Sequence, residues 1–396
     1  MNKDFFLANR NGLQKVVGTS LIVLTGYTSL QRAGDAAHPF SQESNFWWLT
    51  GIERPDWWLI MDGKQSILVS PETSQAHHVF DGSLSAKDAQ RISGVDKVIT
   101  NEQAEQYLVK LAKKYPHVVT LGREPFAKHY DFALNPAPQA LYRKLKRTFR
   151  NVEDCRLELA KLRAIKQPVE IAAIKKAVAL TVDAFQAVRQ QLPSYGYEYE
   201  IEADFTHYFR SRGAAGHAYD PIVAFGVNAC TLHYIDNQAK FEQGLVLLDV
   251  GARVDGYAAD ITRTYAIGKV SKRQRDVHKA VESAHHKVIG LLRPGLSIIE
   301  YHEQVDVIMK EALDGLGLLK KPEDYRRYFP HAISHGLGVD VHDALGRPTE
   351  FLPGMILTVE PGIYIPEEGI GVRIEDDILI TKDGHENLSA ALSTAL

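Results

Sequence analysis

LLDVGARVDGYAADITRTY, at residues 247–265, predicts the element on which the second half of this 396-residue chain is built. Apolar and β-branched runs flank Asp255-Gly256, and a two-residue Asp-Gly loop is a strong signal for a β-hairpin. With that turn Gly251 faces Asp260, and Asp249 lies two positions from this pair. Because side chains alternate along a strand, Asp249 and Asp260 share one face. The pattern predicts two neighbouring carboxylates, provided that no bulge shifts the register.

A second pair of strands is predicted near the end of the chain, from MILTVEPGIYI (355–365) and VRIEDDILIT (372–381). Each places one carboxylate, Glu360 or Glu375, inside an otherwise apolar strand. Buried carboxylates on neighbouring strands repel one another unless a cation lies between them. Both hairpins therefore predict a site for positive charge.

Four histidines accompany these carboxylates. HAISHGLGVDVHD contains His331, His335 and His342, and TLHYIDN contains His233. One of them can bind a metal while the others donate hydrogen bonds to a substrate. Carboxylates with an imidazole suit manganese(II), cobalt(II), iron(II) or zinc. Two such ions would hold a hydroxide between them as nucleophile and polarise a scissile carbonyl.

Each of these residues also has an ordinary structural explanation when it is taken alone. Asp249 can cap a turn, a single histidine can be a surface or core residue, and Glu375 can form a modest salt bridge with Arg373. Five such coincidences would be needed at once, so the set as a whole favours a metal site.

Composition narrows the class of protein. The chain is 45% hydrophobic and 24% charged, with a formal charge of -3, which is typical of globular proteins and offers no basic field for nucleic acid. Its two cysteines, Cys155 and Cys230, lack CxxC spacing and are compatible with a reducing compartment. The apolar run at 21–24 is too short to cross a membrane. We expect a cytoplasmic protein without a membrane segment.

The order of elements indicates two domains. Strand-like runs alternate with helical stretches in the first part, which favours an α/β unit. A charge-rich stretch with a Gln-Pro break near residue 167 favours a boundary close to residue 160. Helical periodicity follows at 171–191, 274–292 and 298–316. We therefore predict an α/β (α+β) protein with domains at 1–158 and 159–396.

The quoted segments resemble the signature segments of the aminopeptidase P and prolidase group of pita-bread metallopeptidases. SQESNFWWLTGIERPDWWLIM, at 41–61, is similar to the amino-terminal domain found in aminopeptidase P, prolidase and creatinase. The resemblance implies a pita-bread catalytic domain behind a smaller creatinase/aminopeptidase P-like α/β domain.

The resemblance also implies a ligand set for two divalent ions, with manganese(II) the expected metal and cobalt(II), iron(II) or zinc as alternatives. Asp249 would bind one ion. Asp260 and Glu375 would bridge both, and His335 and Glu360 would complete the shell of the other.

Further roles follow from the same resemblance. Glu360 would move the proton, and His233 and His342 would contact the substrate and stabilise the tetrahedral intermediate. His331 would line the proline side of the cleft, and Arg373 would orient Glu375 or bind a substrate carboxylate.

The expected activity is that of an Xaa-Pro aminopeptidase acting on small proline-containing peptides as a homodimer or larger homo-oligomer. An Xaa-Pro dipeptidase is the main alternative, because QAHHVFDGSLS (75–85) lacks the tryptophan and paired arginines of aminopeptidase P, and Gly336 stands where a bulky aromatic is common. A non-catalytic peptide-binding module or a metal-free creatine amidinohydrolase would have no reason to keep five intact ligands.

Overall fold

The structure is a computed structural model that describes residues 1–122, 124 and 132–396. The chain divides into two compact units, Met1–Leu162 and Arg163–Leu396. This division lies in helix α7 (Arg156–Ala164), the helix that also contains the sequence-based boundary after residue 158. Within the described residues, no helix combines the length and apolar character needed to cross a membrane.

The first unit is built on one mixed sheet. Its strands are β1 (Leu21–Thr25), β4 (Trp58–Met61), β5 (Ser66–Ser70), β6 (Lys97–Thr100), β7 (His117–Thr120) and β8 (Asn151–Asp154). The other elements are α1 (Lys3–Val17), α2 (Ser44–Thr50), α3 (Gln75–Phe80), α4 (Ala86–Ser93), α5 (Asn101–Ala112), α6 (Ala137–Thr148) and the small hairpin of β2 (Gln31–Ala33) and β3 (Ala36–Ala37).

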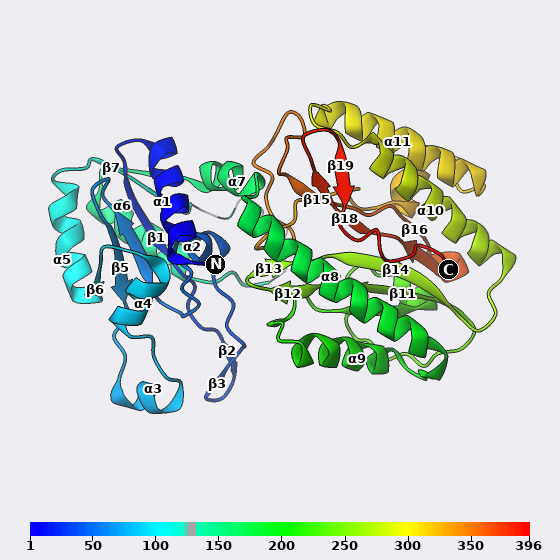
Figure 1. The fold of residues 1–396 in the computed structure, drawn as a ribbon, viewed down its shortest axis with the longest axis horizontal. Helices are drawn as coiled ribbons and strands as arrows, with labels where there is room; N and C mark the ends of the chain where they lie inside the picture. The colour runs from blue at the N-terminus through cyan, green and yellow to red at the C-terminus, as the bar shows by residue number, and fades with distance from the viewer. Residues whose placement is uncertain (123, 125–131) are drawn as a thin grey trace. The chain divides into compact units, whose positions relative to one another are not determined.

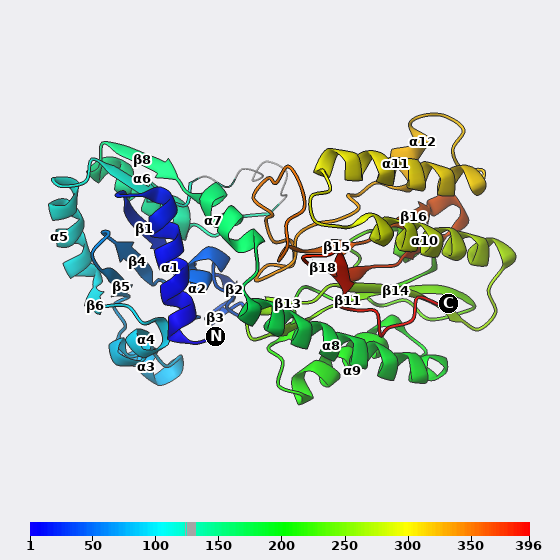
Figure 2. The ribbon, with the colours of Figure 1, turned by 45° about the horizontal axis from the view of Figure 1, so that its top comes forward.

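The strand order in this sheet is β6-β5-β4-β1-β7-β8. Helices α5 and α6 cover one face with apolar side chains such as Leu108 and Leu145, while α1 lies across the other (Figures 1 and 2). The central strand β1, LIVLT, is buried along its whole length, as expected for a strand covered on both faces. The α/β character predicted for this part of the chain is confirmed.

The second unit places strands between pairs of helices. The helices are α8 (Pro168–Gln191), α9 (Glu198–Ser211), α10 (Lys272–Leu291), α11 (Ile298–Gly315) and α12 (Asp324–Tyr328), with short 3-10 turns η1 (Leu192–Ser194), η2 (Gly226–Cys230) and η3 (Pro366–Glu368). The strands are β9 (Gly216–His217), β10 (Ile222–Phe225), β11 (Gly244–Val250), β12 (Ala252–Val254), β13 (Tyr257–Ala258), β14 (Ile261–Ile267), β15 (Ile356–Val359), β16 (Gly362–Ile365), β17 (Ile370–Arg373), β18 (Asp376–Ile380) and β19 (His385–Asn387).

These strands form the ladders β10-β11-β14, β13-β12-β9, β15-β18-β19 and β16-β17. Helices α8 and α9 lie on one side of them and α10 and α11 on the other (Figures 1 and 2). Side chains such as Val281, Met309 and Ile378 form the core between α10, α11 and the nearby strands. The three helices predicted from periodicity are confirmed as α8, α10 and α11.

The first hairpin has the predicted turn and register. Asp255 and Gly256 have φ values of 52° and 86°, and a type I′ turn requires positive φ at both central residues. The β12–β13 and β11–β14 ladders keep the same register on the two sides of Gly251, so no bulge intervenes. A Cβ at Gly251 would lie 1.8 Å from the backbone oxygen of Ala259, so the strands can approach this closely only at a glycine.

The second strand pair, like the first, consists of two ladders separated by a short break. The β15–β18 and β16–β17 ladders also share one register, so Glu360 and Glu375 face each other at the break between them. An isolated bridge joins Thr262 to Glu375. This bridge sets the carboxylates of the two hairpins side by side.

Candidate metal centre

The polar side chains predicted from the two hairpins line one cavity of about 370 Å³. Its lining consists of Leu232, His233, Asp249, Asp260, His331, Ala332, His335, His342, Glu360, Arg373 and Glu375. Every predicted site residue is therefore present in one place. Their assigned roles are not decided by proximity alone and remain predictions.

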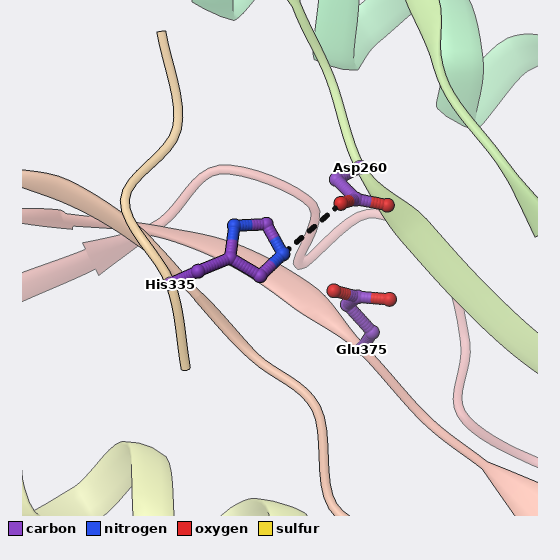
Figure 3. A group of neighbouring side chains, drawn as sticks. All are labelled: Asp260, His335 and Glu375. Atoms are coloured by element: carbon purple, nitrogen blue, oxygen red, sulfur yellow. Dashed lines mark ion pairs between the residues drawn. The ribbon is translucent and has the colours of Figure 1, made fainter. Parts of the chain in front are cut away.

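Three of these residues converge most closely. Asp260, His335 and Glu375 each offer a ligand atom, and these atoms all lie within 4.8 Å of one another. Figure 3 shows the His335 ring and the two carboxylates pointing toward one another from three separate segments. His335 Nε2 lies 3.4 Å from Asp260 Oδ2 and 3.5 Å from Glu360 Oε1.

The backbone fixes the orientation of His335. Its amide N donates to Thr358 Oγ1, and its carbonyl accepts from Thr358 N, so it lies alongside β15. Its Nδ1 lies 3.0 Å from the carbonyl oxygen of Gly336. A carbonyl can only accept, so Nδ1 carries a hydrogen, and Nε2 is the nitrogen that faces the carboxylates and is left to bind a metal. This is the arrangement of a metal-binding histidine.

Electrostatics in the cavity favour added positive charge. Burial and the Asp260, Glu360 and Asp249 carboxylates raise the pKa of Glu375 well above its usual range. Burial raises the pKa of Glu360 to about 7. Burial also disfavours the charged form of His335, but the Asp260 and Glu360 carboxylates outweigh it and raise its pKa to about 9. Protons here occupy the place that a cation would take.

Arg373 is held inside this cluster rather than free in the cavity. Its side chain is 6% exposed and donates from Nε to Thr262 Oγ1 at 3.1 Å and from Nη1 to Tyr364 Oη at 2.9 Å. Nη2 donates to Asp249 Oδ2. The nearest Glu375 oxygen is 3.9 Å from Nε. Arg373 therefore contacts Asp249, a partner that the sequence did not suggest, more closely than it contacts Glu375.

Two further residues support the ligands and escaped the sequence analysis. Tyr219 Oη lies 2.5 Å from Asp249 Oδ1 and 2.6 Å from Asp260 Oδ1. Thr262 Oγ1 donates to Glu375 Oε2 at 2.6 Å. Strand alternation could have pointed to Thr262, which lies two positions after Asp260 on one strand face. Tyr219 comes from a separate segment, and no spacing in the sequence indicates it.

The remaining histidines differ in their surroundings. Burial lowers the pKa of His331 to about 4, with a further contribution from Arg373. Its Nδ1 is 2.7 Å from the carbonyl of Ala332, so Nε2 accepts from Tyr364 Oη at 2.8 Å. The His342 ring lies edge-on to His335, 4.3 Å between centroids. His233 is exposed to the cavity from the segment after η2.

Comparisons with known proteins agree with this geometry. Residues 172–382 match metallopeptidase family M24, and residues 6–120 match the N-terminal domain of aminopeptidase P. The Xaa-Pro aminopeptidase of Escherichia coli K12 is 34% identical over 91% of this chain and 88% of its own length. Human Xaa-Pro aminopeptidase 3 is 33% identical over 93% of this chain and 78% of its own.

Solved structures are similar over the whole chain. Aminopeptidase P from E. coli with the inhibitor Pro-Leu has a TM-score of 0.86 at 31% identity and covers 100% of this chain and 96% of its own. Proline aminopeptidase P II from Yersinia pestis has a TM-score of 0.85 at 32% identity, with 100% and 98% covered. The expected fold, a pita-bread domain behind a smaller amino-terminal α/β domain, is confirmed.

Proposed function

Since the chain belongs to metallopeptidase family M24 and carries an aminopeptidase P N-terminal domain, we propose that it is an Xaa-Pro aminopeptidase. It would hydrolyse the bond between the first residue of a peptide and a following proline. Two observations together carry the proposal. Both domains match, the first the N-terminal domain of aminopeptidase P and the second family M24, and the four carboxylates and one imidazole expected to bind metal line one cavity.

The family implies a dinuclear metal site, and the donors of this chain fit one. Four carboxylates and one imidazole are a hard set that suits manganese(II), with cobalt(II), iron(II) or zinc as alternatives. Asp249 would bind one ion, Asp260 and Glu375 both, and His335 and Glu360 the other. When bound, the ions would polarise the scissile carbonyl and lower the pKa of a water molecule.

Glu360 is the residue that we propose moves the proton. Its Oε1 lies 3.5 Å from His335 Nε2 and its Oε2 3.4 Å from His331 Nδ1, at the wall of the cavity. It would take the proton from water and deliver it to the proline nitrogen as the peptide bond breaks. Proton delivery is essential there because an amide nitrogen leaves poorly without it.

Histidines on the other walls would hold the substrate. His233 and His342 are proposed to donate hydrogen bonds to the carbonyl oxygen as negative charge develops on it. His331 would border the proline ring beside Leu232 and Ala332. A proline nitrogen carries no N–H, so recognition must use the ring and the neighbouring carbonyl.

One observation favours an aminopeptidase over a dipeptidase. A dipeptidase must bind the free carboxylate of the terminal proline, which calls for a cation in the cavity. Among the described residues that line it, Arg373 is the one Lys or Arg, and its guanidinium is engaged with Asp249, Thr262 and Tyr364. No lysine or arginine among the described lining residues is therefore left free for a substrate carboxylate.

The test compares Ala-Pro-Ala with Ala-Pro, using metal-stripped enzyme given back manganese(II) and product analysis by mass spectrometry. Release of alanine from the tripeptide is the expected result. Cleavage of Ala-Pro alone would favour the dipeptidase, and cleavage of neither would count against a peptidase. Cytoplasmic location and homo-oligomerisation remain part of the proposal.

A further inference from the structure

His233 lines the cavity, but no neighbouring side chain that the structure describes holds its ring in place. Its side chain is exposed, and no described residue forms a hydrogen bond with its ring. The position of the ring therefore depends on the position of the backbone segment that carries it. That segment, residues 226–239, contains η2 and turns but no strand.

One buried carboxylate, that of Glu198, binds this segment through several hydrogen bonds. Glu198, the first residue of α9, is fully buried, and each of its oxygens accepts two hydrogen bonds. Oε1 accepts from Phe225 N at 2.7 Å and from Asn228 Nδ2 at 3.1 Å. Oε2 accepts from Tyr234 Oη at 2.8 Å and from Ala239 N at 2.7 Å. These donors lie before, within and at the end of residues 226–239.

The setting suits an ionised acceptor. A carboxylate has about four lone-pair sites and no hydrogen to donate, so four converging donors match its full capacity. Glu198 also stands at the N-terminus of α9, where the helix dipole favours negative charge. Helix α9 thus fixes the position of Glu198, and Glu198 in turn binds four donors from another part of the chain.

A second, separate set of hydrogen bonds, made by Asn237, fixes the segment near its end. Asn237 is buried with φ of 48°, and its Oδ1 accepts from Val223 N at 3.0 Å. Its Nδ2 donates to Pro221 O and Glu202 Oε2, both at 2.9 Å. Asn237 anchors the end of the segment to β10, whereas Tyr234, which Glu198 binds, is next to His233.

We propose that Glu198 is a positioning residue for His233, acting through Tyr234 and the backbone of residues 226–239. The inference rests on the proposed role of His233 in stabilising the developing oxyanion. Geometry matters for that role because a donor helps only when it is preorganised at the place where charge appears. Glu198 itself lies outside the cavity lining, so it would act through other residues.

Two variants weaken the arrangement to different degrees. Glu198→Gln turns one acceptor oxygen into an NH₂ group, which would face donors that it cannot bind. Tyr234→Phe removes the bond that Tyr234 Oη donates to Glu198, together with a long 3.5 Å bond accepted from Gln238 N, and keeps the ring. Glu200→Gln is the matched control, because Glu200 lies two residues further along α9 and, within the described part of the chain, accepts from Gly196 N and Tyr197 N instead.

The test is a double-mutant cycle on Ala-Pro-Ala hydrolysis by the manganese-loaded enzyme. Glu198→Gln should lower kcat about tenfold with little change in KM, as loss of a transition-state contact does. Tyr234→Phe should have a smaller effect in the same direction, and Glu200→Gln should leave kcat unchanged. In a His233→Ala background, Glu198→Gln should lower kcat no further.

An equal tenfold loss with and without His233 would overturn the proposal, because Glu198 would then act on something else. Unchanged kcat in both Glu198→Gln and Tyr234→Phe would overturn it as well. Hydrogen–deuterium exchange of residues 225–239 tests the positioning independently of activity, so a wrong positioning can be distinguished from a wrong proposed function. Exchange should rise in Glu198→Gln and not in Glu200→Gln, even if wild-type enzyme cleaved no proline peptide, and equal exchange in the two would refute the positioning.

Discussion

Tyr219 Oη lies 2.6 Å from Asp260 Oδ1, and the same oxygen lies 2.5 Å from Asp249 Oδ1. One phenol thus joins the two aspartates of the first hairpin. Each aspartate keeps its other oxygen for Arg373 or His335. The phenol has a single hydrogen, so it holds the two aspartates by sharing that hydrogen between their facing oxygens.

Removing that phenol should weaken metal binding. Tyr219→Phe keeps the ring and deletes the hydroxyl, so we expect the affinity for manganese(II) to fall by about 10- to 100-fold, the usual effect of losing a partner of a ligand. Calorimetric titration of the metal-free protein measures it. Tyr195→Phe is the control, because Tyr195 makes a similar 2.5 Å bond to Asp204 outside the cavity lining. Equal effects in the two variants would contradict the assignment.

Arg373 should act on Asp249 and not on the substrate carboxylate. Arg373→Lys keeps the charge but loses the fork that reaches Thr262, Tyr364 and Asp249, so kcat/KM should fall about tenfold or more. The loss should be the same for Ala-Pro-Ala and for its C-terminal amide. A loss confined to the free carboxylate would instead assign Arg373 to substrate binding.

The close approach at Gly251 should make this position intolerant of a side chain. Gly251→Ala would place Cβ against the Ala259 carbonyl and should destabilise the fold by about 2 kcal/mol or more. Gly290→Ala in α10 meets no atom within 4 Å and should stabilise by roughly 0.5–1 kcal/mol. Urea unfolding of both variants checks the prediction, which fails if the two changes have the same sign.

Acid should destabilise the second unit through His217. Burial lowers its pKa to about 4, and Asp220 offsets this only in part. Between pH 6.5 and about 4 the unfolded chain binds a proton that the folded chain does not, so stability should fall as pH falls through this window. The loss is on the order of 3 kcal/mol at most. His217→Gln should flatten the pH dependence of urea unfolding, and an unchanged slope would exclude His217 as its source.

The sequence was sufficient for the residues that local periodicity controls. The Asp-Gly turn defines the register of the first hairpin, and strand alternation then places Asp249 near Asp260. A charge inside an apolar strand identified Glu360 and Glu375. In these cases the chemistry of the residue conflicts with its local pattern, and a single sequence displays that conflict.

Residues whose role depends on tertiary approach could not be found in this manner. Tyr219 and Glu198 are ordinary polar residues until folding brings distant donors or acceptors to them. Arg373 precedes Glu375 by two positions, so local spacing suggests that pair. The bond to Asp249 exists only because the two hairpins pack together.

Metal stoichiometry tests the central claim most directly. Metal-free wild-type protein should bind two manganese(II) ions per chain in a calorimetric titration, and hydrolysis of Ala-Pro-Ala should rise as they bind. Asp260→Ala, which removes a proposed bridging ligand, should bind fewer than two ions and lose this activity. Two ions still bound at full occupancy in Asp260→Ala, or one or none in the wild type, would contradict the dinuclear centre.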